Sequence, residues 1–457
     1  MTYQEFLKTK QDQIINAGFK VKRDDLNTNA FPYQKDIVEW ALRKGKAAVF
    51  SDCGTGKSIM QLDFADQVCR HTGGNALIVA PLAVAEQTRL EGVKFGIGSV
   101  VCRTQEDVKP GINITNYEML DHFDASEFGC VVLDESSILK SFTSSTRNLL
   151  IDKFRNTPYK LCCTATPSPN DHTELGNHAE FLGIMSRTEM LATYFIHDGS
   201  DTSKWRLKGY GEKKFWEWVA TWAVCVRNPE DLGYDNEGFM LPDLRIKEHV
   251  IETEPDDYEL FARRAETLSE RREARKNSLP LRVEATKQIA EEDQEQYLVW
   301  CDFNNESTAL KAAIPECIEV VGSDTPDKKA AAALRFASGE TRVLVSKPSI
   351  YGFGMNWQNC HNIIFCGISD SFEQYYQAIR RCWRYGQKQD VNVHIIISDR
   401  EMNILDNIKQ KQKQMEELQS HMISLMKEVT MRELKRTTRI TEEYKPQISM
   451  EVPAWIA

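Results

Sequence analysis

Hydrophobic residues along this chain gather in short runs that alternate with amphipathic helical patterns, first over residues 46–170. A second series of the same kind extends from about residue 297 to about residue 397. This alternation is typical of parallel sheets with helical crossovers, and it predicts two α/β domains in tandem. The strand-like runs are 47–50, 76–80, 112–115, 130–133 and 160–164, followed by 297–300, 318–321, 342–345, 362–366 and 391–397.

The segment between the two series, residues 171–295, has an irregular and helix-rich pattern with breakers that indicate a linker. Phe215, Trp218 and Trp222 recur there at helical spacing, which favours core packing over a base-stacking surface. We place a first domain with a helical extension at 1–240 and a second domain at 241–400.

A basic helical insertion is expected near residues 254–290 of the second domain. Its cationic residues could contact phosphates, but glutamates are interleaved with them, and this pattern favours a solvated face. The cationic residues are Arg263, Arg264, Arg271, Arg272, Arg275 and Lys276.

One long helical pattern follows residue 400, with apolar positions that step mostly by three and four. The apolar seam is rich in methionine and barely three heptads long, so we expect it to pack on the second domain rather than form a coiled coil. Residues 401–457 are therefore interpreted as a C-terminal helix and tail. The apolar positions are Ile404, Ile408, Met415, Leu418, Met422, Leu425 and Val429.

Composition narrows the class of protein without naming it. The net charge of −10 does not indicate nucleic-acid binding, although a basic cleft can lie within an acidic surface. No stretch of about 20 residues lacks charges, and the polar N-terminus is unlike a signal peptide, so we expect a cytoplasmic protein without membrane contact. The 12 cysteines are scattered and form no C-x-x-C pair, which indicates buried, reduced thiols rather than zinc ligands.

The predicted strand at 47–50 leads into the sequence SDCGTGKS, residues 51–58, which opens a helical pattern. Gly54 and Gly56 permit a tight turn that aims backbone N–H groups at an anion, and the helix start adds its positive dipole end. Lys57 supplies a charge for terminal phosphates, and Ser58 a hydroxyl ligand for Mg²⁺. The segment is a Walker A phosphate-binding loop with Ser51 in place of its first glycine, and Asp52 and Thr55 complete the expected ATP-binding residues.

An acidic pair follows the strand-like run at 130–133. Phosphoryl transfer needs a Mg²⁺ clamp and a group that orients and deprotonates water. We assign Asp134 to the metal and Glu135 to the attacking water. A single Asp-Glu pair often belongs to a plain acidic loop, but its position after a phosphate loop favours the functional interpretation.

Further segments fall in an order that identifies a family. They are Phe31-Pro32-Tyr33-Gln34, Thr115-Asn116-Tyr117-Glu118, Thr164-Ala165-Thr166-Pro167, Gly352-Phe353-Gly354-Met355-Asn356, and QAIRRCWRYGQ at 377–387. Together with the phosphate loop and the DESS sequence at 134–137, they resemble a superfamily 2 helicase of the DEAD/DEAH-like kind. The last two segments are most similar to the Swi/Snf-type branch, and the short chain resembles compact forms carried by phages.

This resemblance implies two RecA-like domains with ATP at their interface and nucleic acid across both. Gln34 matches the glutamine that reads the adenine edge, and its amide can donate and accept. Arg381 and Arg384, in the segment that opens with Gln377, match arginines that reach the γ-phosphate from the second domain. Gly354 matches a loop that touches ATP.

The resemblance also implies residues that contact nucleic acid or couple it to the nucleotide state. The strand is expected to be held mainly by its phosphates, with little sequence preference. Position 380 departs from the family pattern, since it holds Arg where the branch usually has Asp, and Arg380 is a further candidate for DNA contact. The matching positions are Pro81, Thr115, Asn116, Tyr117, Thr164, Thr166, Asn304, Lys347 and Asn356, and Arg432, Lys435, Arg436 and Arg439 form a second basic run.

The expected function is that of a monomeric, ATP-dependent DNA helicase or translocase acting on duplex, forked or branched DNA. Replication or recombination proteins are candidate partners, and a phage protein would act in the host cytoplasm. An RNA helicase remains an alternative, although the DESS sequence and Arg380 favour DNA. Another alternative is a non-translocating, ATP-gated protein that recruits a partner through the C-terminal helix.

Overall fold

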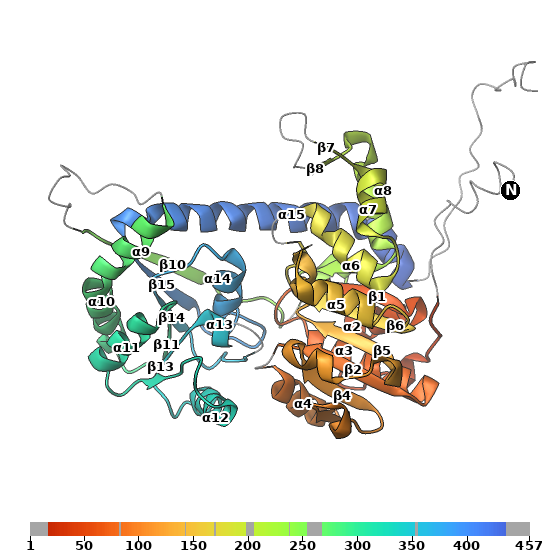
Figure 1. Ribbon diagram of the computed structural model, residues 1–457, viewed down its shortest axis with the longest axis horizontal. Helices are drawn as coiled ribbons and strands as arrows, with labels where there is room; N and C mark the ends of the chain where they lie inside the picture. Colours follow the sequence, from red (N-terminus) through yellow and green to blue (C-terminus); the bar gives the residue numbers. More distant parts are fainter. Residues whose placement is uncertain are drawn as a thin grey trace, which may run out of the picture.

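The computed structural model describes residues 17–81, 84–141, 143–168, 171–197, 205–236, 238–253, 267–351 and 355–435. These residues form two lobes side by side, with a long helix across both (Figure 1). Each lobe is a parallel sheet flanked by helices, so the chain has the predicted architecture of tandem RecA-like α/β domains. We call the part that carries the first sheet lobe 1 and the part that carries the second sheet lobe 2.

Lobe 1 contains seven parallel strands within the described residues, in the order β3-β4-β2-β5-β6-β1-β9. The central strands are buried almost throughout, as expected for a sheet covered on both faces. The strands are β1 (Lys46–Ser51), β2 (Asn75–Ala80), β3 (Ser99–Val101), β4 (Ile112–Asn116), β5 (Phe128–Asp134), β6 (Tyr159–Thr164) and β9 (Ala223–Val226). The helices are α2 (Pro32–Lys44), α3 (Lys57–Thr72), α4 (Ala85–Lys94), α5 (Ser145–Lys153), α6 (Leu175–Leu182), α7 (Arg187–Tyr194) and α8 (Glu212–Ala220), and a hairpin of β7 (Phe195–His197) and β8 (Trp205–Leu207) lies beside α7 and α8 (Figure 1).

Lobe 2 contains six parallel strands within the described residues, in the order β10-β15-β14-β11-β13-β12. The strands are β10 (Leu244–Ile251), β11 (Tyr297–Trp300), β12 (Ile318–Glu319), β13 (Val343–Ser346), β14 (Asn362–Cys366) and β15 (Val391–Ser398). The helices are α9 (Leu268–Asn277), α10 (Leu279–Glu291), α11 (Asn304–Ala313), α12 (Pro326–Ala337), α13 (Pro348–Tyr351) and α14 (Phe372–Ile379).

Two edge strands lie in the segment that the sequence pattern presents as irregular. β9 pairs with β1 and extends the first sheet, and β10 pairs with β15 along its full length. β10 is mostly exposed and carries charged residues, so its apolar positions are too few to indicate a strand. Strand β9 is only four residues long and follows directly on the aromatic helix α8. The boundaries at residues 240 and 400 stay a prediction.

The aromatic positions of α8 pack in the core, as predicted. Phe215 and Trp222 are almost completely buried, and Trp218 is 7% exposed. Trp218 lies against Trp222 and Tyr194 in the same cluster. These side chains hold the helical extension on the sheet of lobe 1 and leave no aromatic face for stacking bases.

The C-terminal helix packs on the second domain, as predicted, but it also packs on the first domain, which the sequence did not indicate. Helix α15 (Met402–Lys435) runs across the top of both lobes (Figure 1). Ile408 and Met415 lie in the core of lobe 2, whereas Met422 and Met426 lie in the core of lobe 1. A helix of 34 residues is about 50 Å long, so its apolar seam extends past one lobe and reaches the next.

The basic insertion matches the expected solvated face only in part, because Arg272 and Lys276 are exposed whereas other arginines are buried in ion pairs. Arg275 is 6% exposed and pairs with Glu306 at 2.7 Å and Asp302 at 3.1 Å, and Arg282 is fully buried against Glu306 at 3.0 Å. These arginines therefore hold α9 and α10 on lobe 2, because buried charges require partners. Residues 254–266, with Arg263 and Arg264, lie outside the described part, as do Arg436 and Arg439.

All 12 cysteines are free thiols, and ten of them are buried, in agreement with the prediction of reduced thiols. Within the described ranges, no helix combines the length and the apolar composition needed to cross a membrane.

Candidate nucleotide site between the lobes

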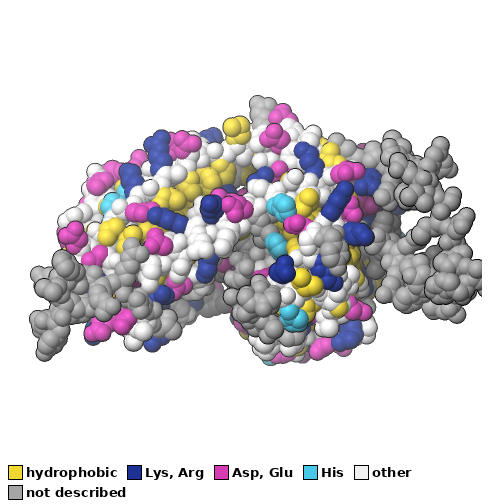
Figure 2. All heavy atoms as spheres, turned by 90° about the horizontal axis from the view of Figure 1, so that it is seen from above, with side chains coloured by type: hydrophobic (Ala, Val, Ile, Leu, Met, Phe, Trp, Pro, Cys, Tyr) yellow, Lys and Arg dark blue, Asp and Glu magenta, His cyan; other side chains and the backbone are white. Residues whose placement is uncertain are grey.

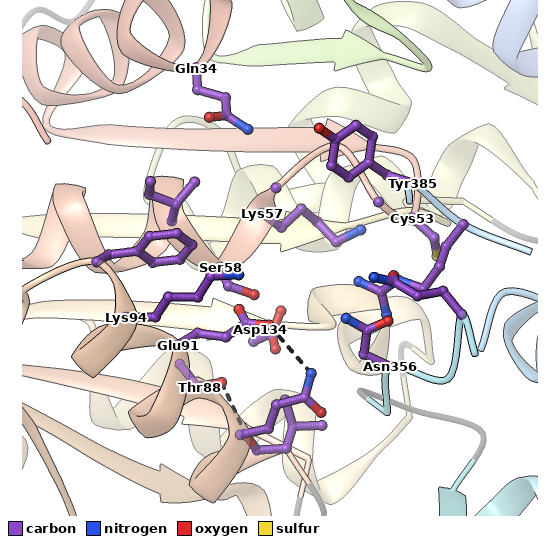
Figure 3. A pocket seen from close by; sticks show the side chains of 18 of the residues that line it. Gln34, Cys53, Lys57, Ser58, Thr88, Glu91, Lys94, Asp134, Asn356 and Tyr385 are labelled. Atoms are coloured by element: carbon purple, nitrogen blue, oxygen red, sulfur yellow. Dashed lines mark hydrogen bonds between the residues drawn. The ribbon is translucent and has the colours of Figure 1, made fainter. Parts of the chain in front are cut away.

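A cavity of about 310 Å³ lies where the two lobes meet. Figure 3 shows Lys57 and Ser58 on the lobe 1 side, with Asn356 and Tyr385 entering from lobe 2. The cavity therefore has walls from segments that are more than 300 residues apart in the chain. The predicted residues that line it are Gln34, Gly54, Gly56, Lys57, Ser58, Asp134, Glu135, Asn356, Arg381 and Arg384.

The phosphate loop has the backbone that its glycines predicted. Gly54 and Gly56 have φ values of +88° and +84°, in the left-handed region that glycine adopts without strain. A Cβ at Gly56 would lie 2.2 Å from Nε2 of Gln34, and one at Gly54 would lie 2.8 Å from the backbone nitrogen of Tyr385. Each glycine thus permits a close approach that any side chain would block.

Helix α3 begins at Lys57, directly after this loop, and presents its N-terminal N–H groups to the cavity. The Lys57 ammonium donates to the carbonyl oxygens of Ser51 at 3.0 Å and Asp52 at 3.3 Å. Phosphate oxygens would be stronger acceptors for this ammonium, because charge-assisted hydrogen bonds exceed those to neutral carbonyls. The loop, the helix start and Lys57 together fit a triphosphate.

The acidic pair lies at the end of β5, with Asp134 as the last strand residue. Gln61 donates to Oδ1 of Asp134 at 2.7 Å, and the backbone N–H of Glu135 donates to the same oxygen at 3.1 Å. Neither bond uses Oδ2, and Ser58 lines the same cavity. Mg²⁺ commonly takes one carboxylate and a hydroxyl alongside phosphate oxygens and waters, so Asp134 and Ser58 fit this cation.

Glu135 has a strained backbone, with a φ of +51°. Among the described residues, only glycines also have a positive φ. Its Oε2 is buried without a hydrogen-bond partner among the described residues. Burial raises the pKa of its carboxyl from 4.5 to about 7, against the opposing effect of Lys57. The side chain is therefore a candidate base, because its proton affinity is matched to neutral pH.

This pKa predicts the pH dependence of turnover and of stability. A base must be ionised to act, so ATP turnover should rise as the pH rises through about 7. The folded-state pKa lies above the usual value of 4.5, so the folded protein binds the extra proton and the stability contributed by Glu135 falls as pH rises between these values. Glu135→Gln should abolish turnover and raise the Tm of the nucleotide-free protein more at pH 8 than at pH 5.

Thermal melts at the two pH values, with Glu91→Gln as a control at the same cavity, measure this effect. Each kcal/mol of relieved burial penalty should appear as roughly 2–4 °C in Tm. An equal gain at pH 5 and pH 8 would show that Glu135 is ionised to the same extent in the folded and unfolded chains.

The two arginines that enter from lobe 2 differ in how many bonds they already make. Arg381 donates to the backbone oxygen of Gln377 at 2.9 Å, to its Oε1 at 2.9 Å and to the carbonyl oxygen of Met355 at 3.1 Å. Arg384 donates to Met355 at 3.1 Å, and its Nε is buried without a partner among the described residues. Arg384 thus has more donors left for an anion, while Gln377, which is fully buried and does not line the cavity, orients Arg381.

Gln34 lies against the phosphate loop rather than free in the cavity. Its Nε2 donates to Thr55 O at 2.8 Å and to the Tyr33 hydroxyl at 3.2 Å, and its Oε1 accepts from the N–H of Phe31 at 2.8 Å. For Gln34 to contact an adenine edge, its amide must break these hydrogen bonds and form new ones with the base. The aromatic side chains of Phe31, Phe239 and Tyr385 line the same end of the cavity.

Two loop residues predicted to bind the nucleotide do not line the cavity. The hydroxyl of Thr55 donates to Asp52 O at 2.8 Å and is 3.0 Å from Ser51 Oγ, so it braces the loop from inside. The carboxylate of Asp52 accepts a hydrogen bond from Tyr376 of lobe 2. Gly354 lies outside the described residues.

Comparison with known proteins identifies lobe 2. Residues 281–386 match the family model described as the helicase conserved C-terminal domain, and this range contains β11 to β14 and both cavity arginines. This part of lobe 2 is therefore similar to the C-terminal domain of helicases.

None of the curated proteins matches this chain. A solved structure described as the Sulfolobus solfataricus SWI2/SNF2 ATPase core in complex with dsDNA is similar in fold. It has 16% sequence identity and a TM-score of 0.43, and it covers 91% of this chain and 99% of its own.

Several residues predicted to contact nucleic acid lie at the carboxyl ends of strands in both lobes. Pro81 follows β2, Asn304 opens α11 after β11, and Lys347 follows β13. Thr115 and Asn116 end β4 but are 1% and 8% exposed, and Thr115 Oγ1 and Asn116 Oδ1 are buried without partners among the described residues.

Tyr117, Thr164 and Thr166 form hydrogen bonds with other protein groups. The Tyr117 hydroxyl donates to the carbonyl oxygen of Asp134 at 2.6 Å, so it supports the acidic pair. Thr164 Oγ1 accepts from the N–H of Thr166 at 3.1 Å, and the Thr166 hydroxyl donates to Glu373 of lobe 2 at 3.4 Å. A movement of lobe 2 relative to lobe 1 would therefore change the contacts of the threonine pair.

Several residues that line the cavity were not predicted from the sequence. Glu91 and Lys94 come from α4, and Phe239 comes from the segment that connects the lobes. Neither region carries a motif, so only the helical spacing of Gln87, Glu91 and Lys94 could have placed them on one face. Tyr385 lies within the arginine segment and could have been noted.

Proposed function

We propose that this protein is an ATP-dependent DNA helicase or translocase, which hydrolyses ATP between its lobes and uses the cycle to move on, or remodel, duplex, forked or branched DNA. The observation that carries the proposal is one cavity in which Lys57, Asp134 and Glu135 of lobe 1 face Arg381 and Arg384 of lobe 2. A triphosphate in this cavity would be held from both sides, and its cleavage would remove the link.

The chemistry assigned to each group follows from its position. Lys57 and the helix start bind the phosphates, Glu135 accepts a proton from the attacking water, and Arg384 stabilises charge on the transferred group. Mg²⁺, held by Asp134 and Ser58, would neutralise charge on the phosphates when bound.

We propose that the polymer runs along the carboxyl ends of the strands, over Pro81 in lobe 1 and Asn304 and Lys347 in lobe 2. Ligands of parallel α/β sheets bind at this edge. Another candidate, the face that carries α15, shows basic side chains interspersed with acidic ones and no continuous basic band among the described residues (Figure 2). Phosphate contacts at the strand ends would give little sequence preference.

The motif pattern at 352–356 and 377–387 supports the Swi/Snf-type branch. A single panel tests the proposal. ATP turnover is measured without nucleic acid and with single-stranded, duplex, forked and four-way DNA and duplex RNA, and strand separation is followed on the same substrates.

We expect turnover to rise with DNA, and most with duplex or branched forms. Stimulation by RNA alone would establish an RNA helicase instead. Turnover that no nucleic acid changes would overturn the proposal. If Glu135→Gln kept the biological effect while losing turnover, the protein would be an ATP-gated recruitment factor rather than a motor.

A further inference from the structure

Arg380, the departure from the family pattern, reaches across the lobes to the phosphate loop. Its Nη2 lies 2.5 Å from Oδ2 of Asp52, and the hydroxyl of Tyr376 donates to Oδ1 of Asp52 at 2.6 Å. Arg380 Nη2 also donates to the Tyr376 hydroxyl at 3.0 Å. Asp52 thus receives both side chains at the end of α14, while its Oδ1 accepts the N–H of Cys53 at 2.7 Å.

The surroundings of this ion pair exclude water. The side chain of Arg380 is 8% exposed and that of Asp52 is 12% exposed. The guanidinium of Arg380 lies over the rings of Trp383 at 4.4 Å and Tyr376 at 5.1 Å. Removal of one partner from a buried ion pair leaves the other charge buried and unpaired. The loss of one partner therefore costs more free energy here than in an exposed pair.

The pair belongs to a continuous face of α14. Glu373, Tyr376, Gln377 and Arg380 follow one another at helical spacing, and each contacts lobe 1. Glu373 pairs with Lys140 and accepts from Thr166, and Gln377 Oε1 lies 3.6 Å from the thiol of Cys53. The backbone of Tyr385 meets the loop at Gly54 on the same side. Each of these contacts joins a protein group of lobe 1 to a protein group of lobe 2.

Neither Asp52 nor Arg380 lines the nucleotide cavity, so neither is placed to touch the phosphates. Burial also removes Arg380 from any surface that DNA could reach. The residue is instead next to Arg381 in the chain and one turn before Arg384, which do line the cavity. An anchor at position 380 therefore sets the position of both arginines relative to the phosphate loop.

We propose that Asp52, Tyr376 and Arg380 form a latch that docks lobe 2 on the phosphate loop, with Arg380 as a positioning residue for the cavity arginines. The role in turnover rests on the proposed ATP hydrolysis. With the latch, the two halves of the site are held together by contacts between the lobes. Without it, docking would depend on nucleic acid bound across both lobes.

The test compares Arg380→Gln, Asp52→Asn and the double variant in steady-state ATP turnover, without DNA and with saturating duplex DNA. We expect each single variant to lower DNA-free kcat about tenfold, in line with the coupling of close, desolvated charge pairs. DNA should restore much of the rate, so that stimulation by DNA becomes larger than in the wild type. The double variant should be no worse than either single one.

Arg342→Gln is the matched control, because Arg342 pairs with Glu316 at 2.8 Å and both residues belong to lobe 2. It should leave the stimulation ratio unchanged. An equal loss with and without DNA for Arg380→Gln would overturn the latch in favour of a local packing role. A weaker Kd for DNA with unchanged DNA-free turnover would also overturn it, in favour of DNA contact.

Hydrogen exchange of the nucleotide-free protein separates this proposal from the proposed function. The amide of Cys53 is bonded to Asp52, so loss of Arg380 should speed exchange in the loop peptide that contains it. Faster exchange in a protein without ATP turnover would keep the latch and reject the ATPase. Unchanged exchange in an active ATPase would reject the latch alone.

Discussion

Arg384→Ala should leave ATP binding nearly intact and lower turnover by about 10³-fold, the lower range for removal of an arginine that stabilises phosphoryl transfer. The reason is the small number of bonds that hold this guanidinium in its own lobe. It donates to the carbonyl oxygen of Met355, and its Nε has no partner among the described residues. Its remaining N–H donors can form hydrogen bonds with the transferred phosphoryl group as negative charge develops on it.

Single-turnover hydrolysis and the binding of a fluorescent ATP analogue measure the two effects separately. Arg384→Lys is the conservative control, which keeps the charge but not the planar fork, and it should recover only part of the rate. Near-normal turnover in Arg384→Ala would show that Arg381 alone, or a group outside the described residues, faces the γ-phosphate.

Lys57→Ala should remove both ATP binding and turnover, with a loss in kcat/KM of at least about 10²- to 10³-fold. Lys57 stands at the start of α3 with its ammonium over the loop, 3.0 Å from Ser51 O and 3.3 Å from Asp52 O. This position lets it bind phosphate oxygens in the ground state and in the transition state, so affinity falls together with rate.

Lys94→Ala removes a charge from the same cavity and serves as the control. Lys94 is exposed, so solvent screens its charge and we expect a change of only a few fold. Equal effects of the two substitutions would mean that the cavity attracts ATP by net charge and that Lys57 has no special position.

The phosphate loop, the acidic pair and the strand pattern could be predicted because each is a local property. A glycine turn between a strand and a helix creates an anion site wherever it occurs, and carboxylates at a strand end face the same edge. Five residues of the loop line one cavity together with Asp134 and Glu135; they are Cys53, Gly54, Gly56, Lys57 and Ser58.

Other features depend on contacts that no local pattern contains. Asp52 and Arg380 are paired across the lobes, and each has an ordinary solvent-facing interpretation in its own segment. Arg275 and Arg282 resemble a charged surface in sequence, yet they are buried against Glu306. A charge run specifies that partners are needed but not which carboxylates the fold brings near.

The amino-acid sequence by itself determined two parallel α/β domains, a triphosphate loop and an acidic pair, because spacing along one strand or helix sets these features. The tertiary structure decided that α15 joins both lobes, that Arg380 holds the phosphate loop, and that Arg381 and Arg384 meet Lys57 in one cavity. The physical reason is that burial and charge pairing across lobes depend on which distant surfaces meet, and that follows from packing of the whole chain.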